Sequence, residues 1–570
     1  MRCTPRRALA IWLALIVSAA LSLPAAGLAG TGTTVTRAGQ TLVVLEDDIA
    51  PALDPDGPSS AHPGTEEINA NTMDTLLDYP STLRNGILIP NYRAPTQQLV
   101  PRLATSWKRS GATWTFTLRK GAKSCAGNEL TADDVVWTFA RAKSVSGASP
   151  VAWFLGNVMG ILPLEPLISK DPKAKELKGE VTKVGRYSVR FKPQHASELF
   201  PKFLQIFALG IFDSAELKKH ATARDPWAHN YTLTQNSPGF GAYCLTRWIK
   251  GSEMNLESNP NYWQGTPKYT KIVIRKVPQD SNRLAAIRAN SAQIVTQLTP
   301  EEIANVKKDP NISVLEWFNT EQLSLGLNYA YAPWNLPKNA LLRQAIAYAL
   351  PYKEIIANDY RGDARPWLGL IPSSFIGYKK IDRYRTNVAK AKQLLARAGF
   401  PGGKGLEKYA SALTLSYAAE RSTVNEPIGN RIRTALAQIG INITLAPIPL
   451  AQFTDRTLTK RDMPMFLNDA VRSFGPDAGY SALLFFVSVK KGGLINPGQY
   501  SSAKVDALYA ASATQVGARR AKTLNTMQDI LANDLPVIPI AERPSIITVR
   551  KGISNWAGRS DNVITFFYLK

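Results

Sequence analysis

Apolar and polar residues follow two periods along this 570-residue chain, and the two alternate from segment to segment. In residues 113–121, TWTFTLRKG, apolar residues occupy every second position, which is the pattern of a half-buried β-strand. In residues 341–350, LLRQAIAYAL, and 388–400, VAKAKQLLARAGF, they recur at helical spacing and predict helices with one buried stripe, the second ending at Gly399. Thr131, with Asp134 three residues later, predicts another helix start. The chain is therefore expected to be a mixed α and β protein.

The first 29 residues have the pattern of a secretory signal peptide. Three arginines precede an apolar run at residues 8–23, and the small-residue stretch PAAGLAG follows it. The run is short for a membrane span, and we place the cleavage near Gly30. The nearest upstream cysteine, Cys3, precedes the run, so no cysteine follows the cut to carry a lipid anchor. We expect a free protein in the periplasm, with residues 1–29 removed.

Basic residues are in excess along the whole chain. Cleavage removes three arginines and no acidic residue, which lowers the formal net charge from +24 to +21. The one lysine-rich stretch, SKDPKAKELKGEVTKVGR, is interleaved with acidic residues, and no basic stripe with aromatic residues accompanies it. This pattern favours a solvated surface over nucleic-acid binding.

Processing leaves about 540 residues, too many for one hydrophobic core, so two or three compact lobes are expected. Two cysteines remain, Cys125 and Cys244. In an oxidising compartment they either pair, which closes a loop worth about 4 to 5 kcal/mol in the chain-entropy model, or stay buried as free thiols. The sequence leaves both states open, because pairing requires Cα atoms within about 7 Å.

Motifs of catalysis, cofactor binding and metal binding are missing from the sequence. There is no GxSxG elbow, no P-loop, no GxGxxG motif and no HExxH or close His/Cys group. The adjacent Asp133 and Asp134 suit a helix start better than a catalytic carboxylate pair. We expect no cofactor and no metal, and a secreted hydrolase acting on a small peptide or glycoconjugate remains only as an alternative. The histidines are His62, His195, His220 and His229.

Four segments, in this order and spacing, resemble the family 5 extracellular solute-binding proteins of ABC importers, which include oligopeptide-, dipeptide- and nickel-chelate-binding receptors. The resemblance runs from about Leu42 to the C-terminus. The segments are LVPRLATSWKRSGATWTFTLRKGAKSCAGNELTADDVVWTFARA (99–142), SPGFGAYCLTRWIKGSEMNLESNPNYWQGTPKYTKIVIRKVPQDSNRLAAI (237–287), LLRQAIAYALPYKEII (341–356) and VAKAKQLLARAGFPGG (388–403).

The resemblance implies an α/β fold of the type II periplasmic-binding-protein kind, with two lobes joined by a hinge of two strands. An extra subdomain is expected within lobe I. The implied boundaries are 30–278 and 539–570 for lobe I, 75–205 for its subdomain, 279–538 for lobe II, and hinge crossings near 277–281 and 537–544.

The function implied by the resemblance is binding without chemistry. Such a receptor captures a peptide-like or anionic small solute in a cleft that closes on it, and delivers the solute to an ABC importer. The implied partners are the solute, the permease pair and its ATPases. We expect a monomer that is not an enzyme and does not bind nucleic acid.

Arg472 is the sharpest candidate for the ligand site. In peptide-binding relatives this part of lobe II looks like a Trp-x-x-Asp run four residues ahead of a proline, and that aspartate meets the ligand's α-ammonium group. Anchored on Pro476, Arg472 takes the place of the aspartate and Asp469 that of the tryptophan, which favours an anionic ligand group. If the register is shifted, Asp469 or Asp477 supplies the amine-binding carboxylate instead, or Arg472 pairs with one of them.

The resemblance suggests further residues around the cleft. Trp153 and Phe154 lie in the extra subdomain, Tyr480 follows the Gly-Pro-Asp turn, and Asn328 ends the strand-like LSLGLNY near the hinge. Asp54 lies in the first ligand-facing loop, where it is more typical of a turn than of a ligand contact.

Two turns depart from the family pattern. Residues 124–127, SCAG, stand where an FHDG-like turn is usual, and residues 239–243, GFGAY, stand for Gly-Thr-Gly-Pro-Tyr. Cys125 and Cys244 lie in or beside these turns, which raises the expectation of a bridge between them.

Overall fold

The computed structural model describes residues 40–144, 154–161, 180–194, 199–206, 209–337, 339–469, 473 and 475–570. The described residues belong to one compact unit, Gly39–Lys570. The predicted signal peptide, Trp153 and Arg472 lie outside the described residues.

One large sheet runs through the unit in the order β10-β11-β12-β1-β13-β19-β14-β18-β16-β17, with β15 paired to β19. β1 is parallel to β12, and β16 is parallel to both β17 and β18. The long strands β14 and β19 are antiparallel partners in its centre. The strands are β1 (Gln40–Glu46), β10 (Tyr243–Ile249), β11 (Glu253–Ser258), β12 (Tyr269–Lys276), β13 (Ile294–Val295), β14 (Ile312–Leu327), β15 (Arg365–Pro366), β16 (Thr414–Ala418), β17 (Thr444–Ile448), β18 (Met465–Asn468) and β19 (Val537–Arg550).

Smaller sheets surround the N-terminal part of the large one, in the orders β6-β7-β9-β8, β20-β4-β3 and β2-β5. The strand predicted at residues 113–121 is confirmed as β7, in which Trp114, Phe116 and Leu118 are buried. The strands of the smaller sheets are β2 (Leu77–Asp78), β3 (Ser81–Arg84), β4 (Ile87–Pro90), β5 (Val100–Pro101), β6 (Ala104–Ser110), β7 (Thr113–Leu118), β8 (Val181–Gly185), β9 (Ser188–Phe191) and β20 (Trp556–Ala557).

The predicted helices are present. Both the amide and the hydroxyl of Thr131 donate to Asp134 at the start of α2, and the segment after α11 ends at Gly399 with a φ of 99°. The helices are α1 (Pro63–Thr72), α2 (Ala132–Ser144), α4 (Phe200–Phe203), α5 (Ser214–Lys218), α6 (His229–Thr234), α7 (Asp280–Arg288), α8 (Pro300–Val306), α9 (Asn339–Ala349), α10 (Tyr352–Glu354), α11 (Val388–Arg397), α12 (Ser422–Ala437), α13 (Leu450–Thr454), α14 (Ala478–Phe485), α15 (Ala503–Thr514) and α16 (Gly517–Asp534).

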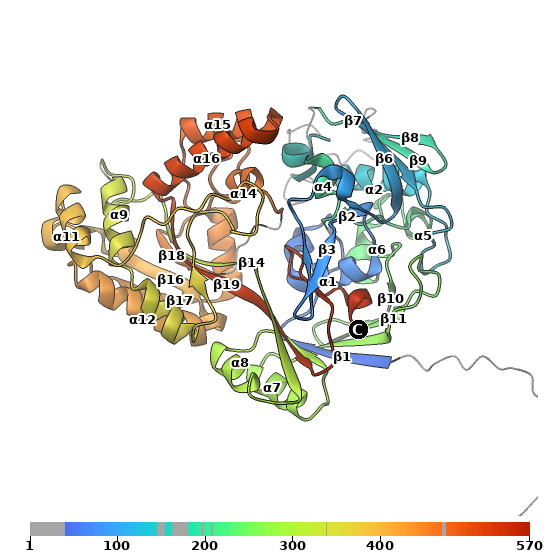
Figure 1. Cartoon of the computed structure of the whole chain (residues 1–570), viewed down its shortest axis with the longest axis horizontal. Coiled ribbons are helices and arrows are strands. Elements are labelled where there is room, and N and C mark those ends of the chain that lie inside the picture. Colours follow the sequence, from blue (N-terminus) through green and yellow to red (C-terminus); the bar gives the residue numbers. More distant parts are fainter. Residues whose placement is uncertain are drawn as a thin grey trace, which may run out of the picture. The chain divides into compact units, whose positions relative to one another are not determined.

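The elements form two groups around separate cores. Figure 1 shows α1, α2 and α4–α6 with β1–β12, and α9, α11, α12 and α14–α16 with β16–β18. We call the first group lobe I and the second lobe II. Each has its own apolar clusters, while β14 and β19 run from one group to the other. The sheet is therefore continuous, and the two sets of clusters meet at α14, because Tyr480 and Leu484 belong to a cluster of lobe I.

The expected first crossing, residues 277–281, runs into the start of α7. After this helix, β13 pairs with β1 through Val44 and Ile294. Leu45, Ile287 and Val306 share a buried apolar cluster, which holds the α7–α8 segment against β1. The first strand to continue into lobe II is β14, which ends beside β18. Residues 537–544, where the C-terminal crossing is expected, form the first part of β19.

Cys125 and Cys244 form a disulfide, with their Cα atoms 5.8 Å apart. Of the two states that the sequence left open, the structure has the bridge. It joins the turn after β7 to β10, and the neighbouring Ser124 donates a hydrogen bond to Asp213. Because this carboxylate also caps α5, the bridge lies within a connected structural unit of lobe I.

Candidate ligand-binding site

A buried polar cluster lies where β18 ends. Asp469 follows the strand and is 5% exposed. Its Oδ2 accepts a hydrogen bond from Asn425 Nδ2 at 3.1 Å and lies 3.3 Å from Arg421 Nη1, both at the start of α12. Its backbone oxygen accepts from Arg421 and, at 2.6 Å, from Arg543 of β19. We call Asp469, Arg421, Asn425, Arg543, Glu321 and Tyr360 the Asp469 cluster.

Several polar atoms of this cluster are not satisfied. Among the described residues, no hydrogen-bond partner reaches four buried atoms, which are Asp469 Oδ1, Asn425 Oδ1, Tyr360 Oη and Arg543 Nε. Buried polar atoms are rarely left in this state, because each costs a desolvation penalty unless a water or a ligand satisfies it. Two acceptors and two potential donors therefore offer contacts to a molecule that brings both kinds of group.

The electrostatics of the cluster keep the guanidinium group of Arg543 charged. Burial opposes the charge on Arg543, but Tyr360, Glu321 and Asp469 raise its pKa above the usual value. Arg543 Nη2 donates to Glu321 at 3.0 Å. The pKa of Tyr360 is raised, chiefly by burial, so this phenol keeps its proton. The cluster holds two carboxylates and two guanidinium groups, so its formal charges balance.

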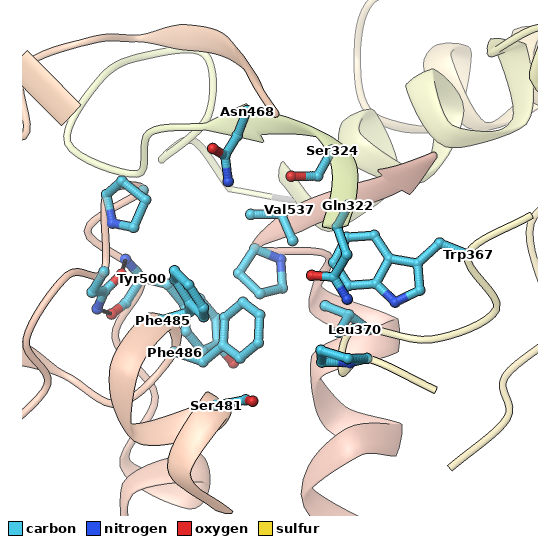
Figure 2. A pocket seen from close by; sticks show the side chains of 15 residues that line it. Gln322, Ser324, Trp367, Leu370, Asn468, Ser481, Phe485, Phe486, Tyr500 and Val537 are labelled. Carbon is cyan, nitrogen blue, oxygen red and sulfur yellow. Dashed lines mark hydrogen bonds between the residues drawn. The ribbon is translucent and has the colours of Figure 1, made fainter. Parts of the chain in front are cut away.

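A pocket lies between the central strands and α14, and its lining residues Gln322 and Asn468 alternate along β14 and β18 with Glu321 and Asp469 of the cluster. The empty space in and in front of it is about 550 Å³, which includes open solvent. Figure 2 shows aromatic and aliphatic side chains facing one another across it. We call it the β14–α14 pocket. Its described lining residues are Gln322, Ser324, Trp367, Leu370, Pro372, Asn468, Ser481, Phe485, Phe486, Asn496, Pro497, Gly498, Tyr500, Pro536 and Val537.

Helix α14 has apolar contacts with both lobes. Tyr480 packs against Phe154 and Phe203 of lobe I, with ring centroids 5.7 and 5.8 Å apart. On the same helix, Ala482 and Phe486 belong to an apolar cluster of lobe II. The helix therefore forms an aromatic contact between the lobes beside the pocket, and burial raises the pKa of Tyr480 well above its usual value.

The residues expected at the ligand site are divided by the structure. Asp469, Phe154 and Tyr480 lie in or beside the region just described, whereas Trp153 and Arg472 lie outside the described residues.

Asp477 is engaged structurally. Its Oδ1 caps α14 by accepting from Gly479 and Tyr480, and Arg520 contacts both of its carboxylate oxygens at 2.7 and 2.8 Å. Asn328 is also engaged, because its side chain donates to Arg461 and accepts from Ala330.

Asp54 lies in a buried ion cluster of lobe I. Arg141 donates to both of its carboxylate oxygens, at 2.7 and 3.0 Å, and His229 Nδ1 lies 2.6 Å from Oδ2. Burial opposes its ionisation, but Arg141 and His229 lower its pKa below the usual range. Its contacts lie within lobe I.

Sequence reasoning missed six residues of the cluster and the pocket, and no local motif marks them. They are Tyr360, Arg421, Asn425, Arg543, Glu321 and Gln322. Arg543 falls within the predicted crossing 537–544, which was the one signal available for it.

Metal-ligand clusters and membrane-spanning helices are both missing from the described residues. In these ranges, no three His, Cys, Asp or Glu side chains gather as metal ligands. In the same part of the chain, no helix combines the length and apolar character that a membrane span needs.

Comparisons with known proteins identify the family of the chain. The family model "Bacterial extracellular solute-binding proteins, family 5 Middle" matches residues 98–492. The dipeptide-binding protein of Escherichia coli K12 is 26% identical over 488 residues, covering 82% of this chain and 85% of that protein. Heme-binding protein A of Haemophilus influenzae is also 26% identical, covering 79% of this chain and 80% of that protein.

Solved structures share the fold. The periplasmic binding protein DppA of Helicobacter pylori, in complex with the peptide STSA, has a TM-score of 0.73 at 23% identity, over 93% of this chain and 98% of that one. The dipeptide-binding protein of Pseudoalteromonas sp. SM9913, in complex with Met-Leu, has a TM-score of 0.76 at 18% identity, over 93% and 100%.

The chain has the two-lobe α/β fold of these periplasmic binding proteins, which confirms the predicted fold class. The chain belongs to the bacterial extracellular solute-binding proteins, family 5. Members of this family are substrate-binding receptors of ABC importers, so the chain is a receptor and the secreted hydrolase has no support.

Proposed function

We propose that this receptor binds a peptide-like solute with no net charge at its polar end, and that the Asp469 cluster holds that end. The observation that carries the proposal is the set of four unsatisfied buried atoms in a charge-balanced cluster. A free ammonium group donates to Asp469 Oδ1 and Asn425 Oδ1. A carboxylate oxygen, whose charge balances that of the ammonium group, accepts from Arg543 Nε and Tyr360 Oη.

The charge balance favours a zwitterionic or neutral end over a purely anionic one. A lone anion leaves Asp469 Oδ1 and Asn425 Oδ1 without donors, and each unsatisfied buried acceptor costs about 1 to 3 kcal/mol. An anionic solute depends on Arg472, which lies outside the described residues. Two relatives support the peptide assignment by name, the dipeptide-binding protein of Escherichia coli and di/tripeptide-binding protein 2 of Pseudomonas aeruginosa.

Closure is proposed to occur about β14 and β19. Their pairing is interrupted between Phe318 and Gln322, which leaves a short irregular segment beside the ligand site. Lobe I then takes the chain up to β14 and again beyond β19, with its extra subdomain near residues 75–205. We further propose that the protein works as a monomer in the periplasm after loss of residues 1–29, and that its closed form contacts the permease.

The test combines native mass spectrometry of freshly purified protein with thermal shift against dialanine and dileucine. A dipeptide at a hundredfold excess over its Kd should stabilise the wild type by about 2.7 kcal/mol. Asp469→Asn should weaken binding at least tenfold, whereas Asp455→Asn, a partly exposed carboxylate of lobe II, should not. Absence of any dipeptide response, or equal binding by the Asp469 variant, contradicts the proposal.

A further inference from the structure

A second, polar pocket lies in lobe I, where the end of α1 meets the C-terminal segment. Phe566 of that segment shares an apolar cluster with Leu42 of β1, so the segment is part of lobe I. The empty space in and in front of the pocket is about 330 Å³, which includes open solvent. We call it the lobe I pocket. The residues of its lining that matter here are Asn69, Asp78, Arg102, Arg559, Thr565 and Tyr568.

Both guanidinium groups of the lining are already neutralised by a carboxylate of their own. Arg102 Nε donates to Asp74 Oδ1 at 2.9 Å. Arg559 Nη2 donates to Asp561 Oδ2 at 2.7 Å. Neither positive charge is therefore left over for a third acid.

Asp78 is that third acid, and it lines the pocket without an ion-pair partner among the described residues. Its Oδ1 accepts from the Tyr79 amide at 2.8 Å, which leaves Oδ2 for a further donor. Burial raises the pKa of Asp78 above its usual value, although Arg102 and Arg559 oppose this from beyond ion-pair distance. A carboxylate in such surroundings is costly until a cation approaches it. The pocket thus has one uncompensated negative charge.

Two other residues of the lining have buried polar atoms that are not satisfied by the described part of the chain. Asn69 is fully buried, and its Nδ2 donates to the Leu53 carbonyl at 3.1 Å while its Oδ1 has no partner. Thr565 is 5% exposed, and its Oγ1 has no partner either. Buried polar atoms are rarely left in this state. Water satisfies their hydrogen bonds but does not neutralise Asp78, whereas an ammonium group does both with its three donors.

Tyr568 adds a donor to the same pocket. Its Oη accepts from Arg102 Nη1, which leaves its own proton for another acceptor. Burial raises the pKa of Tyr568 to about 12, so the phenol stays protonated at neutral pH. A neutral acceptor such as a hydroxyl fits here better than a carboxylate, because a carboxylate adds negative charge to a pocket that already has an excess of it.

We infer that the lobe I pocket is a second binding site of this protein, and that it takes a small primary ammonium compound with a neutral acceptor, such as ethanolamine. The ammonium group donates to Asp78, Asn69 and Thr565, and the acceptor is bound by the Tyr568 hydroxyl. The site goes beyond the proposed function, because none of its lining residues belongs to the Asp469 cluster.

The experiment measures ethanolamine binding to the purified protein by saturation-transfer difference NMR. The wild type should give a saturable signal. Ethylene glycol, in which a hydroxyl replaces the ammonium group, should give none, and neither should the anion acetate. Each titration is repeated in potassium chloride and in tetramethylammonium chloride at equal concentration, and the two salts should compete alike and weakly.

Three variants locate the site. Asp78→Asn keeps the size of the side chain and an oxygen for the Tyr79 amide but removes the charge, and should weaken ethanolamine binding at least tenfold. Thr565→Val keeps the shape and removes one acceptor, and should also weaken binding. Asp133→Asn removes a carboxylate of lobe I whose side chain is 55% exposed, and should bind ethanolamine like the wild type.

Four outcomes overturn the inference. They are a wild type without a saturable signal, a folded Asp78→Asn that binds like the wild type, displacement by potassium but not by tetramethylammonium, which makes the pocket an alkali-cation site, and loss of the signal in Asp469→Asn instead of Asp78→Asn. Circular dichroism establishes folding, and should Asp78→Asn not fold, Thr565→Val decides. The proposed function stands in each case, because it rests on dipeptide binding.

Discussion

Two buried carboxylates, one in each lobe, have opposite surroundings. Asp54 in lobe I is contacted at both oxygens by Arg141 and at one by His229. Arg141 also donates to Trp227 and Thr232, so its donors are used as well. Asp469 in lobe II is as well buried, yet its Oδ1 has no partner among the described residues.

The contrast between Asp54 and Asp469 distinguishes a structural carboxylate from one that still offers an oxygen atom to a ligand. A buried ion cluster whose atoms are all paired has nothing left to offer a solute, and losing one member leaves an uncompensated charge. A buried cluster with unsatisfied atoms costs stability until a solute or water completes it. On this physical ground Asp54, although it lies in a loop expected to face the ligand, is a scaffold residue, and Asp469 is the binding candidate.

The largest effect is expected from Arg141→Met. The change leaves Asp54 and Asp56 buried without their guanidinium, and removing one partner of a buried ion cluster costs about 3 to 5 kcal/mol. Urea denaturation measures it. Arg186→Met, which removes an exposed partner of Glu129, should leave the midpoint close to that of the wild type. If the urea midpoint of Arg141→Met equals that of this control, the assignment of Asp54 and Arg141 as structural residues is contradicted.

The next effect concerns Asp477, which lies eight residues beyond Asp469 but is fully paired. Asp477→Asn weakens the contact to the mostly buried Arg520, and charged hydrogen bonds of this kind contribute about 1.5 to 3 kcal/mol. The free energy of unfolding should fall by that amount while relative dipeptide affinities stay unchanged. A changed preference among dipeptides would show that Asp477 contacts the solute instead.

A third case is a buried acid pair of lobe I, Glu46 and Glu67. Burial raises the pKa of Glu67 to about 8, and the pKa of Glu46 is also well above its usual value because of burial and the neighbouring Glu67. Both acids bind protons more tightly in the folded state. Their stabilising contribution is therefore complete below about pH 4.5, the unfolded value, and is lost as the pH rises through about 8.

Within that pH window, the free energy of unfolding should fall by up to about 1.4 kcal/mol per pH unit. Glu67→Gln keeps an oxygen that is able to accept from the Ile564 amide but removes the titration. Chemical denaturation from pH 5 to 8 should show a smaller slope for the variant than for the wild type. Parallel curves would mean that Glu67 is ionised throughout.

The smallest stability change is expected at Asp469. In Asp469→Asn the lost partner is Arg421, whose side chain is 36% exposed, and ion pairs of that exposure contribute at most about 1 kcal/mol. Stability should stay within about 1 kcal/mol of the wild type although dipeptide binding falls. A loss of stability as large as that of Arg141→Met would place Asp469 among the structural residues and contradict its contrast with Asp54.

Much of the local structure was predictable. The alternation in residues 113–121 is that of β7, the Thr131–Asp134 pair begins α2, and Gly399 ends the segment after α11. Of the site, Asp469 was named only as an alternative to Arg472. Tyr360, Asn425 and Arg543 are not predicted from the sequence. They come from separate segments, with 183 residues between positions 360 and 543, and no local motif marks them.

The sequence by itself determined the periods of strand and helix, the helix ends and the family, because these depend on side-chain spacing, local sterics and hydrogen bonds within a few residues. Only the tertiary structure decided which of two carboxylates is saturated and that Cys125 meets Cys244 across 119 residues. It also placed β14 between β18 and β19 in the sheet. These outcomes depend on which distant atoms pack together, and that is set by the sum of contacts over the whole fold.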